Sequence, residues 1–337
     1  MTDGPDYRDL VWAQGSLTVQ RLGAMLAPVT FVLADGRQVA PMHIAPWAGT
    51  PAEAGLPGIL KRLRGEWPCV PFGYTIDDPT APPDWARLNG TAAPDEEIHG
   101  HSSNSDWTWI KDNGESLALE IEYPAQSPIR RLRRVVTPDP IAAAVDLSLT
   151  IEVKQACRLP LGLHPTFRLP TVAGGARIEP DPFVSGRTFP GTVEPSAPLF
   201  AIDAEFESLA SVPLRVGGRG DATHVPFADD TEDLLQLNGL GRVSLANLDE
   251  RYRVTLSWDQ SVYPSLLLWY SNRGRKGAPW NGRHVALGME PICSPFGLGP
   301  NSAAADNPLA RSGLSTARDF TDGEILTTRY RIEVNPL

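Results

Sequence analysis

Alternation of apolar and polar residues with a period of two constrains the fold of this chain more than any other feature. It runs without a break through residues 145–153, returns at 251–258 and closes the chain at 329–334. Successive side chains of an extended strand point to opposite faces, so this pattern predicts one buried face and one face turned to water or ligand. Residues 29–33, which are mainly β-branched and aromatic, and residues 117–123, which alternate late in the stretch, also indicate strands.

Turn-forming residues separate these stretches. The 337 residues include 33 Pro and 30 Gly, mostly in the connections, and the best helix candidate is a short one at about residues 60–63, within 51–64. Many strands joined by turns predict an all-β protein with a large antiparallel β-sandwich. The motifs described below spread over residues 41–300 without a linker or an internal repeat, so we expect one domain over residues 1–337.

Charge and cysteine content restrict the partners and the compartment. A formal net charge of −10 argues against binding to nucleic acid or to anionic membranes. No apolar run reaches the ~18 residues that a membrane helix needs, and the N-terminus lacks a secretory pattern. Cys69, Cys157 and Cys293 are odd in number and widely spaced, unlike a disulfide framework or a zinc site. We therefore expect a cytoplasmic protein.

His164 stands where a strand-like stretch ends. It follows Leu163 and precedes Pro165, which favours extended backbone at the histidine. Such a position can direct the imidazole into a cleft, where a pKa near ~6.5 allows it to give or take a proton at neutral pH. The alternative is a histidine that only packs in the core.

Glu290 is the second candidate for proton transfer. It follows the apolar residues 285–289, and Pro291 is expected to end the strand just behind it. A buried carboxylate is unfavourable unless it has partners or a chemical role, and partial desolvation would make it a stronger base. The alternative role is a salt bridge to one of three arginines: Arg273, Arg275 or Arg283.

A third segment begins with His99 and His101 and continues through small polar residues to Trp107. Hydroxyls and amides such as that of Asn104 can bond sugar hydroxyls, and an indole can pack on the C–H face of a sugar ring. A His-x-His pair on a strand would point both rings the same way, which leaves a metal site as an alternative. Since no further carboxylate or histidine follows at metal-ligand spacing, we predict no metal.

These segments, in this order, resemble those of the galactose mutarotase-like superfamily, which includes aldose 1-epimerases and hexose-6-phosphate 1-epimerases. Residues 163–167 are similar to the family's histidine motif, and 99–107 to its His-Gly motif. Residues 65–73 resemble the Pro- and Gly-rich segment just upstream, and 289–291 the segment with the catalytic glutamate. The resemblance covers roughly residues 20–300 and depends on the ordered set of motifs.

The resemblance implies a large antiparallel β-sandwich and a cofactor-free enzyme that interconverts the α and β anomers of a free monosaccharide. Glu290 would take the proton of the anomeric hydroxyl, and His164 would protonate the ring oxygen. His99 would bind the substrate and polarise the ring oxygen. We expect the acid and the carboxylate to lie on opposite sides of a gap the size of a sugar ring.

Five further residues are predicted to bind the substrate: Asn104, Trp107, His43, Arg64 and Trp269. His43 belongs to a segment, 42–47, that matches no general mutarotase motif and marks a subgroup with an unusual substrate. Trp269 ends an apolar stretch and would line the cleft next to Glu290, with the sandwich core as the equal alternative.

The chain departs from the hexose-6-phosphate members at one position. They usually carry an Arg four residues after the histidine of the His-Gly motif, where this chain has Ser103. A phosphate contact would then have to come from Arg62, Arg64 or Arg87. The departure favours an unphosphorylated or an acidic sugar.

Two other functions remain open on the same fold. One is a non-catalytic sugar-binding or sensor module, which would not need both His164 and Glu290. The other is a polysaccharide-cleaving enzyme, although such enzymes normally add further domains. The expected partner is a small sugar, and the expected assembly is a monomer or a homodimer.

Overall fold

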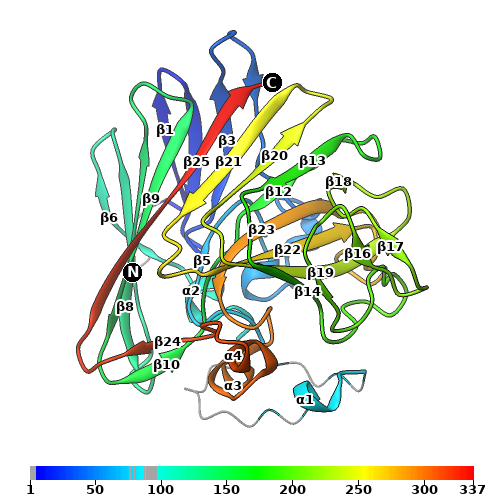
Figure 1. Ribbon diagram of the computed structural model, residues 1–337. Coiled ribbons are helices and arrows are strands. Elements are labelled where there is room, and N and C mark those ends of the chain that lie inside the picture. Colours follow the sequence, from blue (N-terminus) through cyan, green and yellow to red (C-terminus); the bar gives the residue numbers. More distant parts are fainter. Residues whose placement is uncertain (1–4, 76–77, 79, 87, 89–96) are drawn as a thin grey trace.

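The computed structural model describes residues 5–75, 78, 80–86, 88 and 97–337, most of them in antiparallel strands and their connections (Figure 1). One layer is a nine-stranded sheet. Its strands, in spatial order, are β18 (His224–Val225), β13 (Ala176–Pro180), β20 (Arg242–Asn247), β21 (Tyr252–Trp258), β25 (Ile325–Pro336), β9 (Ala144–Val153), β8 (Ile129–Pro138), β7 (Leu117–Glu122) and β6 (Thr108–Asp112). In Figure 1, β25 runs in red between β9 and β21.

The second layer is an eight-stranded sheet. Its strands, in spatial order, are β15 (Glu205–Phe206), β14 (Ser185–Thr188), β19 (Thr231–Asn238), β22 (Ser265–Asn272), β23 (Val285–Cys293), β11 (Leu161–Leu163) and β5 (Pro68–Cys69). The eighth strand, β12 (Thr166–Arg168), pairs with β23 on the same side as β11. The residues between β11 and β12 therefore lie beside β23.

Smaller elements complete the described part of the chain. A four-stranded sheet contains β1 (Tyr7–Trp12), β2 (Gly15–Gln20), β3 (Leu26–Val32) and β4 (Gln38–Val39), and two-stranded pairs form from β10 (Cys157–Leu159) with β24 (Arg318–Phe320) and from β16 (Val212–Pro213) with β17 (Arg219–Gly220). The helices are α1 (Pro83–Ala86), α2 (His101–Asn104), α3 (Gly299–Ala304) and α4 (Pro308–Arg311). None of these helices is long and apolar enough to cross a membrane.

The main core lies between the two large sheets, as the alternation predicted. Along β22, Leu266, Leu268 and Tyr270 pack in the same buried cluster as apolar side chains of the nine-stranded sheet. Leu267 belongs to a separate cluster, and Trp269 points to the same side as Leu267. One face of the eight-stranded sheet therefore packs against the nine-stranded sheet. The opposite face, which carries Leu267 and Trp269, contributes to a second cluster and to a cavity.

The all-β architecture with a large antiparallel sandwich is confirmed, and so are the five expected strands, which correspond to β3, β7, β9, β21 and β25. The short helix expected within residues 51–64 is wrong. The chain forms two 3-10 turns there, η1 (Pro51–Glu53) and η2 (Gly58–Leu60). Prolines at 51 and 57 and a left-handed glycine at 58 (φ 44°) break the segment too often for an α-helix.

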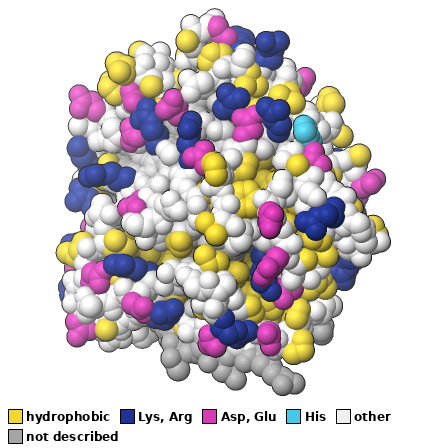
Figure 2. Space-filling view, viewed as in Figure 1, with side chains coloured by type: hydrophobic (Ala, Val, Ile, Leu, Met, Phe, Trp, Pro, Cys, Tyr) yellow, Lys and Arg dark blue, Asp and Glu magenta, His cyan; other side chains and the backbone are white. Residues whose placement is uncertain are grey.

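Acidic and basic side chains are mixed on the surface. The face drawn in Figure 2 shows Lys and Arg side chains next to Asp and Glu rather than in separate fields. Many of them form ion pairs, as Arg331 of β25 does with Asp146 of β9 and with Asp139, at 2.7 Å each. Exposed pairs of this kind contribute little to stability, typically below ~1 kcal/mol each.

Candidate active site

A cavity of about 340 Å³ lies on the second face of the eight-stranded sheet. Four of the predicted site residues line it: His99, His164, Trp269 and Glu290. They come from three distant segments, since His99 precedes α2, His164 follows β11, and the other two lie on the paired strands β22 and β23. The structure thus brings together the two histidines and the carboxylate that the sequence motifs single out.

Glu290 lies inside β23, not at its end, so the expectation that Pro291 ends the strand is wrong. β23 continues to Cys293, and Pro291 pairs with Leu266 of β22. On the other edge of β23, the neighbouring strand is β12 as far as Gly288 and β11 from Ile292 onward. Pro291 lies between these two paired regions, so its missing N–H interrupts no pairing on that edge.

The carboxylate of Glu290 is almost completely buried, with 2% of the residue exposed. Burial raises the pKa of Glu290 well above its usual value. The expected alternative partners Arg273 and Arg275 bind other carboxylates, those of Asp230 at 2.9 Å and Glu232 at 3.0 Å. Glu290 is therefore a desolvated carboxylate with raised basicity.

His164 faces Glu290 directly. Its Nε2 lies 3.5 Å from Oε1 of Glu290, and its Nδ1 lies 3.2 Å from the hydroxyl of Thr166. The ring stacks on Trp67, with centroids 4.1 Å apart. Burial, together with the neighbouring His99, lowers the pKa of His164 well below its usual value. At 3.5 Å no sugar ring fits between the two groups, so the expected arrangement on opposite sides of a ring-sized gap is wrong.

His99 takes up a left-handed backbone conformation with φ 59°, and Gly100 follows with φ 77°. This turn places the ring against His164, with centroids 5.0 Å apart. Nδ1 of His99 accepts a hydrogen bond of 3.2 Å from the backbone N–H of Gly73, so the neutral ring carries its proton on Nε2. Burial lowers the pKa of His99 to about 4, which keeps the ring neutral at pH 7.

His101 lies in a different environment from His99, because it begins α2 instead of continuing a strand. Its Nδ1 lies 3.1 Å from the hydroxyl of Ser105 and 3.6 Å from a carboxylate oxygen of Glu97. The metal-site alternative required the rings of His99 and His101 to point the same way from a strand, and the structure does not place them so.

Trp269 forms part of the cavity wall and is held by buried polar partners. Its Nε1 donates a hydrogen bond of 2.7 Å to Glu232, whose side chain is fully buried. The same carboxylate binds Nε of Arg275, and the Arg275 guanidinium lies over the rings of Trp269 (5.4 Å) and Trp280 (4.5 Å). Arg275 and Trp280 also line the cavity.

Asn104 and Trp107 do not line this cavity. The Asn104 amide donates to the carbonyls of Ile98 and Gly100 and accepts from the N–H of Ile59. Trp107 is fully buried, and its Nε1 donates to the carbonyl of Ser102. Both side chains support the loop that carries His99, so their predicted contact with substrate has no direct route in this geometry.

His43 and Arg64 also lie outside the cavity lining. His43 is buried and its ring contacts that of His284, with centroids 4.5 Å apart. Arg64 donates to the carbonyl of Arg62, and its guanidinium lies 5.7 Å from the ring centre of Tyr7. Arg87, a further candidate for a phosphate contact, falls outside the described residues.

Several site residues were missed at the sequence level: Arg275, Trp280, Trp67, Glu232 and Gly288. A β-carbon on Gly288 would lie 2.3 Å from Oε1 of Glu290, so only glycine leaves room for the carboxylate. Glu232 gave a usable signal, since an acidic residue inside an apolar strand needs a partner.

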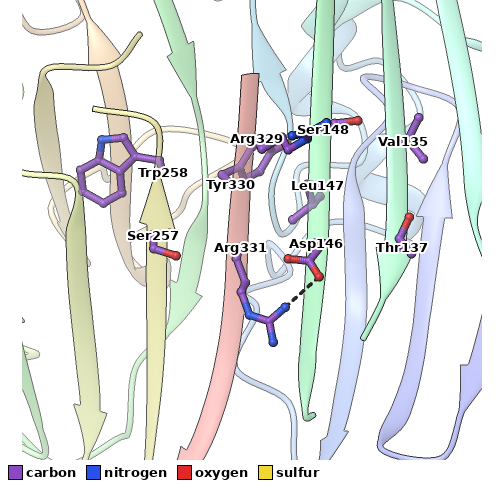
Figure 3. A pocket seen from close by; sticks show the side chains of 10 residues that line it. All are labelled: Val135, Thr137, Asp146, Leu147, Ser148, Ser257, Trp258, Arg329, Tyr330 and Arg331. Atoms are coloured by element: carbon purple, nitrogen blue, oxygen red, sulfur yellow. Dashed lines mark hydrogen bonds and ion pairs between the residues drawn. The ribbon is translucent and has the colours of Figure 1, made fainter. Parts of the chain in front are cut away.

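A second hollow, of about 490 Å³, lies on strands β8, β9, β21 and β25 of the nine-stranded sheet and shares no lining residue with the cavity (Figure 3). Asp146 and Arg331 are drawn there joined to each other, at 2.7 Å. Its carboxylate is thus held in an ion pair, whereas Glu290 faces an imidazole. The acid and base pair belongs to the smaller cavity.

Solved structures with this fold are known. The chain is similar to the Slr1438 protein from Synechocystis sp. PCC 6803 (13% identity, 99% of this chain and 97% of that chain, TM-score 0.65). It is also similar to the GalM/aldose epimerase homologue from C. elegans (13%, 98% and 99%, TM-score 0.65) and to a galactose mutarotase-like protein from Lactobacillus casei (15%, 98% and 100%, TM-score 0.62). No family model and no curated protein sequence matches the chain.

These likenesses extend over nearly the whole of each chain, so the fold is that of the galactose mutarotase-like β-sandwich, as the ordered motifs predicted. At 13–15% identity they establish the architecture and not the reaction.

Proposed function

We propose that this protein is an aldose 1-epimerase, an isomerase that interconverts the α and β anomers of a free sugar. The observation that carries the proposal is the pair of His164 Nε2 and Glu290 Oε1, 3.5 Å apart in one cavity. The anomeric oxygen and the ring oxygen of a sugar are bonded to the same carbon. An acid and a base that serve these two atoms must therefore lie close together.

In the proposed reaction, Glu290 accepts the proton of the anomeric hydroxyl while protonated His164 donates its Nε2 proton to the ring oxygen. The ring C–O bond breaks, its electron pair goes to the ring oxygen, and the anomeric carbon becomes a carbonyl. After rotation about the adjacent C–C bond, the two transfers run in reverse and close the other anomer. Each proton-transfer partner typically contributes ~10²–10⁴-fold.

Burial favours the proton exchange in the direction of ring opening. Ring opening converts a carboxylate and an imidazolium into a carboxylic acid and a neutral imidazole. The pKa of Glu290 is raised and the pKa of His164 is lowered, and both shifts favour the neutral pair. In water the charged pair would be stabilised by solvation, and the same transfer would be less favourable.

His99 supports the reaction as a neutral donor. Because its Nδ1 accepts from Gly73, its Nε2–H is available to a sugar oxygen in the cavity. We assign it to the ring oxygen or a neighbouring hydroxyl, next to His164. A sugar-binding module without catalysis would need such a donor but not a matched acid and base, which is why isomerisation is preferred over binding alone.

The cavity gives little support to a phosphorylated substrate. Arg62 and Arg64 lie outside its lining, and Arg275 is already paired with Glu232. Ser103, at the position where the hexose-6-phosphate enzymes usually carry Arg, is buried and donates to the carbonyl of His99 at 2.7 Å. We therefore assign the protein to unphosphorylated sugars.

The test is anomer exchange measured by polarimetry and NMR on a panel of freshly dissolved sugars. The wild-type protein is expected to accelerate equilibration, and Glu290→Gln is expected to lower the rate at least ~100-fold. Glu207→Gln, at an exposed site outside the cavity, is the matched control and keeps the wild-type rate. Near wild-type turnover in Glu290→Gln, or no acceleration of any sugar, would refute the proposal.

A further inference from the structure

The two sides of the cavity differ in chemistry. His99, His164 and Glu290 meet on one side, within 5.0 Å between the ring centres and 3.5 Å between imidazole and carboxylate. The remaining lining includes an aliphatic wall, which we define as Ile59, Leu60, Leu63, Val193, Leu234 and Leu267. A sugar held by the acid and base therefore presents another part of its ring to hydrocarbon.

Strand register places part of this wall next to the reacting groups. Leu267 of β22 lies directly opposite Glu290 of β23, and Leu234 of β19 lies opposite Trp269. Directly opposed side chains in antiparallel strands are within contact distance. The wall is thus adjacent to the carboxylate.

Two polar side chains of the lining direct their polar atoms elsewhere. Nε1 of Trp269 donates to Glu232, so the indole offers the cavity its carbon surface. The hydroxyl of Thr192 lies 3.2 Å from that of Thr80 and accepts from Arg215 at 3.3 Å. Both groups already have hydrogen-bond partners within the protein.

The charges of the cavity are also balanced. Arg275 lies within 3.0 Å of the fully buried Glu232, so its positive charge has a nearby counter-charge. Besides Arg275 and the two histidines, Glu290 is the one acidic or basic side chain among the described lining residues. An anionic group on the substrate would approach a carboxylate without gaining an unpaired cation.

We infer, given the proposed anomer exchange, that the substrate is an uncharged cyclic hemiacetal with an apolar flank, as in a deoxy or O-alkylated sugar. A hydroxyl buried against the aliphatic wall would lose its hydrogen bonds to water without replacement, whereas a methyl group there gains contact. A fully hydroxylated hexose and a sugar phosphate are the disfavoured substrates.

The experiment compares anomer exchange for D-glucose, 6-deoxy-D-glucose, 2,3,4,6-tetra-O-methyl-D-glucose and D-glucose 6-phosphate by NMR. The kcat/KM of at least one of the two modified neutral sugars is expected to exceed that of glucose by roughly tenfold, a ratio typical of one buried hydroxyl without a partner. The phosphate ester is expected to be the poorest. The deoxy sugar tests the effect of removing a hydroxyl group, and the O-methylated sugar tests the effect of replacing the hydroxyl hydrogens with methyl groups.

A variant pair links the preference to the wall. Leu234→Gln supplies hydrogen-bonding atoms at a half-buried strand position and is expected to shift the preference toward glucose by at least ~threefold. Leu326→Gln makes the same change at a half-buried position of β25, outside the cavity, and keeps the wild-type preference.

A binding measurement distinguishes the proposed ligand class from the proposed isomerase activity. Tryptophan fluorescence of Glu290→Gln, which retains Trp269 and Trp280 in the cavity, reports binding without turnover. If glucose or its phosphate is turned over as well as both modified sugars, the proposed substrate class is wrong and the isomerase activity stands. If no sugar is turned over but a modified sugar binds more tightly than glucose, the isomerase activity is refuted and the ligand class stands. If there is neither turnover nor binding, both proposals are refuted.

Discussion

The indole of Trp269 contacts one histidine from each of two buried histidine pairs. In the first pair His164 lies 5.7 Å from the indole, ring centre to ring centre, and meets His99 edge to face at 5.0 Å. In the second pair His284 stacks on the indole at 5.4 Å and meets His43 edge to face at 4.5 Å. Burial lowers the pKa of all four imidazoles.

The two pairs differ in access and in partners. His99 and His164 line the cavity, and His164 faces a carboxylate. His43 and His284 lie outside the cavity lining, and the Nε2 of each has no hydrogen-bond partner in the part of the chain that the structure describes. The lowered pKa values therefore reflect burial in both pairs. A partner for proton transfer and access to a cavity are found for the first pair.

The second pair is connected to the cavity through its support of Trp269. Ser271 donates to Glu232 at 2.9 Å, so its oxygen accepts from Nδ1 of His284 at 2.8 Å. Glu232 in turn binds Nε1 of Trp269. We interpret His284 as a positioning residue that holds the wall of the site.

The largest expected effect is on the chemistry of the first pair. His164→Asn is expected to lower the rate of anomer exchange at least ~100-fold, because it removes the acid that protonates the ring oxygen. His284→Asn, the matched change in the second pair, is expected to stay within about threefold in kcat. Exchange rates with circular dichroism as a check of folding measure both, and equal losses would erase the distinction between the pairs.

A smaller loss is expected at Gly288, which lies under the Glu290 carboxylate. In Gly288→Ala the new β-carbon would lie 2.3 Å from Oε1 of Glu290 and 3.0 Å from the β-carbon of Trp269. The carboxylate must turn away from His164, and kcat is expected to fall about tenfold. Gly241→Ala, where the nearest atom is 3.3 Å away, is the control. An unchanged kcat in Gly288→Ala would show that the carboxylate position is not critical.

The sequence allowed the sandwich and the convergence of the site to be predicted for a common reason. Period-two alternation in β9, β21 and β25 states which side chains share a face, and ordered motifs state which segments meet. The alternation could not show that Leu267 and Trp269 face a cavity while Leu266 and Leu268 face the core, because both sides of β22 are apolar.

Residue type alone could not predict the substrate-binding residues, because the same polar group can bind either a ligand or the neighbouring backbone. Asn104 has an amide suited to a sugar hydroxyl, yet the loop around His99 uses that amide for its own backbone. Arg275 was one of three arginines near Glu290 in sequence, and only the path of the loop after β22 brings it to Glu232. These outcomes depend on three-dimensional proximity and not on pattern.

Glu290, which faces His164 of the first pair, is expected to reduce the stability of the folded protein at high pH. Burial raises the pKa of Glu290 in the folded protein above the unfolded value near ~4.3. The stability gained by binding this proton is therefore fully present below pH ~4.3 and is lost as pH rises through the folded pKa. Glu290→Gln stays neutral, so we expect its Tm to exceed that of the wild type by about 2–4 °C at pH 8. Calorimetry should show this gap closing at pH 4, and a lower Tm at pH 8 would contradict it.

The smallest expected effect concerns the second pair. Burial and the nearby Arg168 lower the pKa of His43 to about 4, while the unfolded residue binds its proton near ~6.5. Between these values the unfolded state holds more protons, so His43 reduces stability as pH falls. His43→Phe removes this term, and between pH 7.5 and pH 5 the variant is expected to lose about 2 kcal/mol less of its unfolding free energy than the wild type. Urea unfolding at both pH values measures the difference, and identical losses would mean that the imidazole already has access to protons, as in the cavity pair.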